Sequence, residues 1–219
     1  MKLVGSKMLL DKKRFTLTEL LIVIALVFII ASLLQPSLSR IRERGRQTVC
    51  ANNMNVLTKS HLIYSDDYDG SPVDTTHYLT LDGFVGWPNV QGIPERSILI
   101  VLGYLNTTEV FSCPSDDKTR KDGPSKYIRS ASFSYTRNAY TKNSNMNELN
   151  LRSILLAEEH NLSPMNDGKF YSNQWDFLSD RHDGWSHMSF PNGAVQKLDT
   201  IEFNENTPRW RLDNYLLPN

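Results

Sequence analysis

The fold of this 219-residue chain is decided by one apolar stretch near its start, Phe15-Thr-Leu-Thr-Glu-Leu-Leu-Ile-Val-Ile-Ala-Leu-Val-Phe-Ile-Ile-Ala-Ser-Leu-Leu34. A helix of about 20 residues rises about 30 Å, which is enough to cross the hydrocarbon core of a bilayer. The stretch contains one charged residue, Glu19. A carboxylate inside a membrane costs about 2.5–3.5 kcal/mol, so it normally has a partner or a function. The stretch therefore predicts a membrane-spanning helix in which Glu19 has a partner or a functional role.

Charge is distributed unevenly along the chain, although the formal net charge is zero. Residues 1–14 carry five basic residues and one acidic residue, and residues 15–46 carry four arginines and two glutamates. The remainder is therefore acidic. A basic leader favours a cytoplasmic location for residues 1–14, although the arginines after the apolar stretch weaken this assignment. No basic, aromatic-rich patch follows, so we expect no nucleic-acid binding.

Beyond the apolar stretch, apolar residues continue at helical spacing but cover a narrower face of the predicted helix. Apolar residues from Leu38 to Tyr64 recur at or near helical spacing among polar ones: Leu38, Ile41, Val49, Cys50, Met54, Val56, Leu57, Ile63 and Tyr64. We expect one helix from about Leu17 to about Tyr64, kinked at Pro36 and softened at Gly45. The expected parts are a leader peptide (1–14), a transmembrane half-helix (15–36), an amphipathic half-helix (37–65) and a globular domain (66–219).

The globular domain is expected to contain a small, mostly antiparallel sheet with long loops. Strands are predicted at 127–135, 153–157, 185–190 and 194–198, and a short helix at 94–102. The last two strands flank Asn192-Gly193, and Asn-Gly between two such runs is a strong signal for a hairpin with a type I′ turn. Gly103 is expected to end the short helix. The fold class is therefore α+β, with the amphipathic half-helix packed on the sheet.

The residues around the start of the apolar stretch resemble a known motif. Lys13-Arg14-Phe15-Thr16-Leu17-Thr18-Glu19-Leu20-Leu21 is similar to the processing and assembly signature of type IV pilins and type II secretion pseudopilins. The resemblance implies that a prepilin peptidase cuts between Arg14 and Phe15 and methylates the new amine of Phe15. It also implies an assembly role for Glu19 and a helix bend at Pro36. Arg14 stands where this family usually has glycine.

Several later segments resemble a pseudopilin-like group named for an H-x9-DG motif. His182, nine residues and Asn192-Gly193 match the motif, with Asn in place of the usual Asp. The other matching segments are Cys50-Ala-Asn-Asn53, Tyr64-Ser-Asp-Asp67, Phe111-Ser-Cys113-Pro114-Ser-Asp116 and Ser134-Tyr135-Thr-Arg-Asn138. The resemblance implies a pilin-like fold.

Two groups of residues outside the membrane stretch could have a structural or binding role. Cys50 and Cys113 could form one intramolecular disulfide if the domain is exported, or remain two buried thiols. Asp66, Asp67 and Asp69 could hold calcium. Their spacing is an incomplete EF-hand, so a solvated acidic turn at the end of the helix is the favoured interpretation.

A third group could form a metal or acid–base site. Its members are Glu158, Glu159, His160, His182, Asp183 and His187. They have no recognised ligand spacing, so we expect neither a bound metal nor catalysis, and no cofactor. We expect His182 to brace the hairpin turn by hydrogen bonds.

The sequence thus predicts a pseudopilin-like structural subunit of a type II secretion or type IV pilus-like fibre, not an enzyme. We expect a single-pass protein of the bacterial inner membrane, with its C-terminal domain in the periplasm or on the cell surface. Its expected partners are other pseudopilins, the prepilin peptidase and the assembly platform. Glu19 would pair with the α-amine of Phe15 on a neighbouring subunit. Two alternatives are a membrane-anchored periplasmic module that binds a glycan or peptide, and an anchored hydrolase or metalloenzyme using Glu159, His160 and His182.

Overall fold

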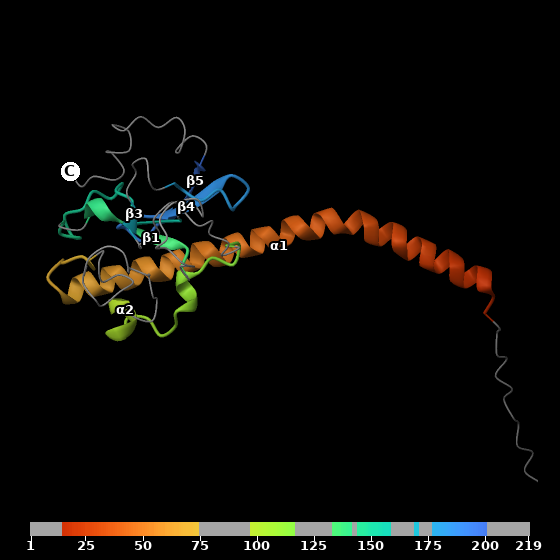
Figure 1. Cartoon of the computed structure of the whole chain (residues 1–219), viewed down its shortest axis with the longest axis horizontal. Coiled ribbons are helices and arrows are strands. Elements are labelled where there is room, and N and C mark those ends of the chain that lie inside the picture. The colour runs from red at the N-terminus through yellow and green to blue at the C-terminus, as the bar shows by residue number, and fades with distance from the viewer. Residues whose placement is uncertain are drawn as a thin grey trace, which may run out of the picture. The chain divides into compact units, whose positions relative to one another are not determined.

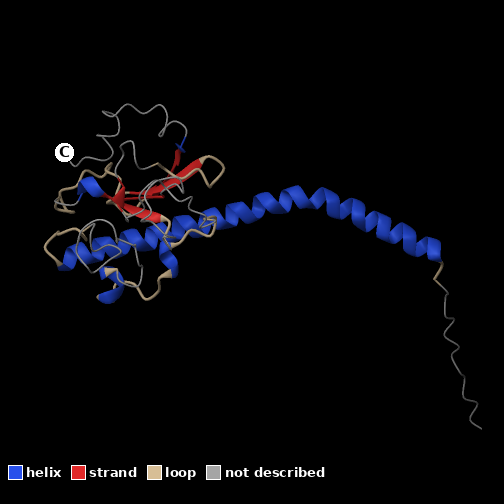
Figure 2. Cartoon of the chain, viewed as in Figure 1, coloured by secondary structure: helices blue, strands red, loops and turns tan. Residues whose placement is uncertain are grey.

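One long helix and a small sheet give the chain an α+β layout (Figures 1 and 2). The computed structural model describes residues 15–74, 97–116, 133–141, 144–158, 169–170 and 177–200. The leader with Arg14, most of the strand predicted at 127–135, and the candidates Glu159 and His160 lie outside these residues. The chain divides into two compact units, Met1–Arg42 and Glu43–Asn219.

Helix α1 spans Leu17–Asp67, close to the helix predicted from the sequence, and Pro36 lies inside it. A capping box begins the helix. The Thr16 hydroxyl accepts a hydrogen bond from the Glu19 backbone N–H at 3.3 Å, and the Glu19 carboxylate accepts one from the Thr16 N–H at 2.8 Å. The carboxylate also accepts a hydrogen bond from the Thr16 hydroxyl at 2.7 Å. Glu19 thus satisfies backbone and side-chain donors at the start of its own helix.

The first part of α1 is apolar on all sides and exposed. Every residue from Phe15 to Leu34 is exposed, and the helix is long and apolar enough to cross a membrane. Such a surface is unfavourable in water at about 25 cal/mol per Å² of apolar area. This part of the helix is therefore consistent with a single membrane-spanning segment.

The second part of α1 is amphipathic, and its inner face lies in the core of the domain. The buried residues recur at helical spacing and include several polar side chains: Gln47, Cys50, Met54, Leu57, Thr58, Ser60, His61 and Ser65. They pack with residues such as Phe111, Tyr135 and Leu155. The apolar stripe predicted from the sequence is therefore partly wrong, because Leu38, Ile41, Val49 and Ile63 are exposed.

A close contact fixes the turn after α1. Gly70 has a φ of +78°, and its N–H donates to the Ser65 carbonyl at 2.8 Å. A Cβ atom at this position would lie 2.2 Å from Oδ1 of Asn145. The Gly70 carbonyl accepts a hydrogen bond from the Met146 N–H at 2.8 Å. The positive φ therefore favours glycine here, and a Cβ would require the Asn145 side chain to move.

Within the described residues the sheet has five strands, in the order β3-β1-β2-β4-β5. The strands are β1 (Tyr135–Asn138), β2 (Leu156–Glu158), β3 (Lys169–Phe170), β4 (Trp185–Ser189) and β5 (Val195–Asp199). All neighbouring pairs are antiparallel except β1 and β3, which are parallel. The strands lie along the amphipathic part of α1 (Figure 1). The prediction of a mostly antiparallel sheet is confirmed, although β1 begins at the last residue of its predicted range.

The short helices of the domain agree only in part with those predicted from the sequence. Helix α2 (Ile98–Val101) falls within its predicted range, and Gly103 follows it with a φ of +82°. Two 3-10 helices, η2 (Glu109–Phe111) and η3 (Ala139–Thr141), were not predicted.

The β4–β5 hairpin is confirmed, but its turn is not type I′. The Gly193 N–H donates to the Phe190 carbonyl at 2.9 Å, which places Pro191 and Asn192 at the centre of the turn. Of the two residues in Asn192-Gly193, only Gly193 has a positive φ, +79°. Proline fixes φ near −65°, so this turn cannot have the two positive φ values of type I′.

Candidate functional site

A disulfide joins α1 to the loop that follows η2. Cys50 and Cys113 are bonded, with their Cα atoms 5.1 Å apart and a sequence separation of 63. Both residues are buried. Closing a loop of this length stabilises a fold by about 4 kcal/mol in the chain-entropy model. The disulfide is therefore a major link between the helix and the rest of the domain.

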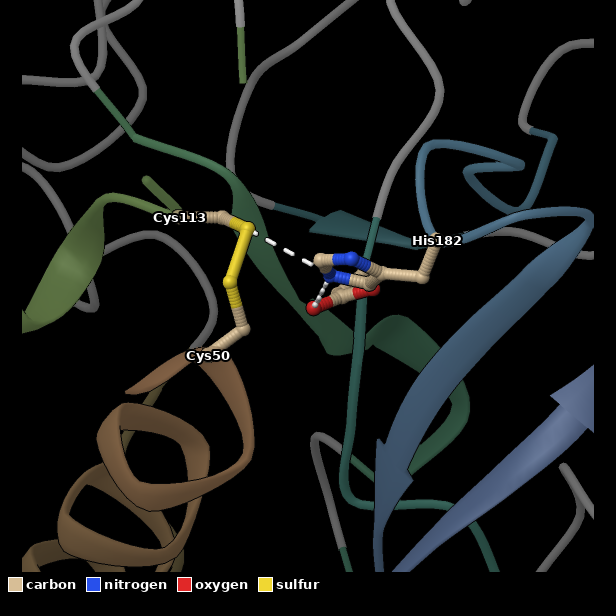
Figure 3. A group of neighbouring side chains, drawn as sticks. Cys50, Cys113 and His182 are labelled. Carbon is tan, nitrogen blue, oxygen red and sulfur yellow. Dashed lines mark hydrogen bonds and ion pairs between the residues drawn. A yellow bond between two sulfur atoms is a disulfide. The ribbon is translucent and has the colours of Figure 1, made fainter. Parts of the chain in front are cut away.

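The His182 ring faces this disulfide (Figure 3). Its Nε2 lies 3.4 Å from Sγ of Cys113 and 3.3 Å from Oε1 of Glu158. Its Nδ1 lies 2.9 Å from Oε1 of Glu43, which belongs to α1. A tight turn places the ring here, since Asp183 and Gly184 both have positive φ values and the Gly184 N–H donates to the Asp180 carbonyl at 3.0 Å.

Glu158, the last residue of β2, is fully buried beside two histidines. Its Oε2 accepts a hydrogen bond from the His187 backbone N–H at 3.1 Å, and its Oε1 lies 3.2 Å from Nδ1 of His187. Burial raises the pKa of Glu158, but the hydrogen bonds from His182 and His187 prevail and lower it to about 2. Glu158 is therefore a carboxylate at neutral pH.

His182 lies between two carboxylates. Burial lowers its pKa, but hydrogen bonds and charge interactions with Glu158 and Glu43 outweigh this and leave the pKa above its ordinary value. Each ring nitrogen faces a carboxylate oxygen, Nδ1 that of Glu43 and Nε2 that of Glu158. Together the three residues form an ion network that joins α1, β2 and the turn before β4.

Polar contacts also hold the loop that carries Cys113. The Ser115 hydroxyl donates to the Glu43 carboxylate at 3.1 Å and 3.2 Å. The Cys113 N–H donates to the Ser134 hydroxyl at 2.9 Å, and that hydroxyl donates to Asp116 at 2.6 Å. Asp116 also forms a buried ion pair with Arg181 at 3.3 Å. The surroundings of the disulfide are thus fixed from several sides.

The structure brings together only part of the predicted metal or acid–base group. Glu158, His182 and His187 meet, whereas Asp183 supplies the positive-φ turn beside them. The expectation that His182 braces the Asn192-Gly193 turn is wrong, because its ring contacts Glu43, Glu158 and Cys113. The turn contacts α1 in another way, through a hydrogen bond from the Asn55 amide to the Gly193 carbonyl at 2.9 Å.

Glu43 contacts His182 but was not predicted from the sequence as a site residue. The only signal is its position on α1, seven residues before Cys50, which places both residues on one face of the helix. Its partner His182 follows 139 residues later in the chain. No local pattern links residues so far apart.

The remaining described residues among the predicted ones form no part of this cluster. Asp66, Asp67 and Asp69 are exposed where α1 ends, and Asp67 accepts a hydrogen bond from the Tyr104 hydroxyl at 2.6 Å. Phe15 and Glu19 lie at the exposed start of α1.

Compared with known proteins, the chain matches no family model, no curated protein and no solved structure.

Proposed function

We propose that this chain is a pseudopilin-like structural subunit of a type II secretion or type IV pilus-like fibre. One observation carries the proposal: a single helix exposes a continuous apolar surface along its first part, with one carboxylate at its start, while a disulfide-linked domain covers its second part. The apolar surface of residues 15–34 would be covered by lipid before assembly and by identical helices in a bundle after assembly. The second part holds a domain on the outside of that bundle.

The disulfide supports export of the domain. Disulfides form and persist in oxidising compartments such as the bacterial periplasm. The basic leader favours the opposite side of the membrane for residues 1–14. A single-pass protein of the bacterial inner membrane, with its C-terminal domain in the periplasm or on the surface, agrees with both features.

The position of Glu19 supports a role in assembly after processing. Its carboxylate accepts hydrogen bonds from Thr16, one residue after the proposed Arg14–Phe15 cleavage site. Cleavage would create a positive α-amine on Phe15 at the same end of the helix. A carboxylate and an amine on adjacent subunits, both in an apolar bundle, cost less together than either does alone. This pair would fix the register between subunits.

The capping box offers a simpler role for Glu19, and one pair of variants separates the two. Glu19→Gln removes the charge but keeps a side chain that can complete a capping box. Thr16→Ala removes the cap and keeps the charge. If Glu19 pairs with an amine, E19Q incorporation into fibres falls by at least about tenfold, since breaking a buried ion pair costs about 3–5 kcal/mol. T16A incorporation then stays near that of the wild type.

The measurement is the amount of each variant in sheared fibres, relative to its amount in the membrane. If E19Q is incorporated normally, or only T16A fails, Glu19 is a helix cap and the assembly role is wrong. A wild-type chain found only as a monomer in the membrane would favour the anchored binding module.

A further inference from the structure

Four donor atoms, each from a different region of the fold, converge at the disulfide. Cys50 comes from α1, Cys113 from the loop after η2 and His182 from the turn before β4 (Figure 3). Glu158 is the last residue of β2. Each residue offers one ligand atom, and these atoms all lie within 4.8 Å of one another in a buried site. We propose that these four residues bind a zinc ion when the disulfide is reduced. The inference goes beyond the proposed function and does not rest on it.

The spacing of the donors agrees with tetrahedral zinc. With Zn–S bonds of about 2.3 Å and Zn–N and Zn–O bonds of about 2.0–2.1 Å, neighbouring donors in a tetrahedron lie about 3.3–3.8 Å apart. Nε2 of His182 already lies 3.4 Å from Sγ of Cys113 and 3.3 Å from Oε1 of Glu158. Once the disulfide bond is broken, the main change required is the separation of the two sulfur atoms.

The residues around the donors already have the arrangement that zinc sites use. A metal-bound histidine usually donates its other ring N–H to a carboxylate, which orients the ring. Nδ1 of His182 lies 2.9 Å from Oε1 of Glu43, so the same contact directs Nε2 toward the sulfur atoms. The backbone N–H of His187 holds the second oxygen of Glu158 at 3.1 Å. Two thiolates, an imidazole and a carboxylate form a donor set that favours zinc over calcium or magnesium.

The reaction balances with a dithiol as the reductant. The dithiol transfers two electrons and two protons to the sulfur atoms of Cys50 and Cys113, and is itself oxidised to a disulfide. Zinc then displaces the two thiol protons, and the proton on Nε2 of His182 if it is present, into solvent. The Glu158 carboxylate binds without change in protonation. In either redox state the site thus links α1 to the loop after η2, by the Cys50–Cys113 bond or through the metal.

The test compares one molecule in its two redox states. The full chain in detergent is reduced with dithiothreitol, desalted under argon and titrated with Zn²⁺ against a chromophoric chelator. A parallel sample receives Co²⁺. We expect the reduced chain to bind about one zinc per chain, as structural sites of this class do. We expect cobalt to give thiolate charge-transfer and tetrahedral d–d bands, while the oxidised chain, as the control, gives neither result.

Variants assign the ligands. His182→Gln and Glu158→Gln are each expected to weaken zinc binding at least about tenfold, and Glu43→Gln about 10- to 100-fold through the orientation of His182. Glu148→Gln, on an exposed loop residue, is the matched control and should bind as the wild type does. The proposal is overturned if the reduced wild type binds no zinc or if the oxidised chain binds it equally well. Zinc bound by the thiols of an unfolded chain would be unaffected by H182Q and E158Q, and that result also overturns it.

Discussion

Nδ1 of His182 lies 2.9 Å from Oε1 of Glu43, a residue 139 positions earlier in the chain. With Nε2 directed at the buried Glu158, this contact joins the helix to the sheet through one imidazole. Histidine can do this because both of its ring nitrogens donate hydrogen bonds when the ring is protonated. The His182 ring also lies beside the Cys50–Cys113 disulfide. A covalent bond and a group of polar contacts therefore hold α1 to the rest of the domain at neighbouring positions.

Removing His182 should destabilise the domain more than removing the charge of Glu43. His182→Gln removes one of the two histidine partners of the buried Glu158 carboxylate, so a loss of about 2–3 kcal/mol is expected. Glu43→Gln keeps a hydrogen-bond acceptor on a partly exposed side chain, so about 1–2 kcal/mol is expected. Urea unfolding of the oxidised full chain measures both changes, and E148Q should lie within about 0.5 kcal/mol of the wild type. Equal losses for H182Q and E148Q would contradict the network.

Reduction of the disulfide should lower the free energy of unfolding by about 4 kcal/mol when zinc is absent. The physical reason is the larger conformational freedom of the unfolded chain once its 63-residue loop is opened. Urea unfolding with and without dithiothreitol, in the presence of a chelator, gives the difference. A reduced chain as stable as the oxidised one would show that the disulfide is not a major link.

Two glycines should respond in opposite directions to replacement by alanine. Gly70→Ala places a Cβ at 2.2 Å from Asn145 on a backbone with a φ of +78°, so a loss of about 1–3 kcal/mol is expected. Gly45→Ala meets no atom within 4 Å, and alanine is the better helix former by about 1 kcal/mol, so this variant should be neutral or more stable. Thermal unfolding of the two variants checks the pair. A destabilised G45A beside a neutral G70A would be inconsistent with the structure.

The contribution of His61 to the stability of the domain should fall in mild acid. Burial, aided by the charge of Arg137, lowers the pKa of His61 well below its ordinary 6.5. The unfolded chain therefore binds a proton below pH 6.5 that the folded chain does not. This contribution to stability is complete above pH 6.5 and declines by about 1.4 kcal/mol per pH unit as the pH falls toward the folded pKa.

His61→Gln provides the control for this pH dependence. Glutamine does not titrate, so the variant should lack this part of the decline, whatever constant loss of stability the substitution causes. The measurement is the free energy of unfolding of both proteins from pH 7.5 to pH 5.0. Parallel curves for the two proteins would show that His61 is not buried in its neutral form.

The elements with strong local patterns were predictable from the sequence. Helix α1 follows from the apolar stretch and the helical spacing after it, and the β4–β5 hairpin follows from Asn192-Gly193 between two apolar runs. The type of turn was not predicted correctly, because Pro191 fixes its own φ. The two-residue strand β3 pairs in parallel with β1 and has no sequence signal of its own.

The buried face of α1 and the candidate site depend on long-range packing. His61 and Thr58 are buried while Ile63 and Val49 are exposed, since the position of the sheet, rather than hydrophobicity alone, decides which face is covered. Glu43 and His182 meet only after the chain has folded. Histidine and glutamate side chains were recognised as candidates, but their partners could not be predicted from spacing.

We propose that the chain is processed and assembled as a pseudopilin-like subunit. The most direct test of this claim is mass analysis of the intact protein and of its N-terminal peptide after extraction from membranes. We predict a mature chain that begins at Phe15 with a methylated amine and has lost residues 1–14. A protein that retains Met1–Arg14 in full would contradict the claim.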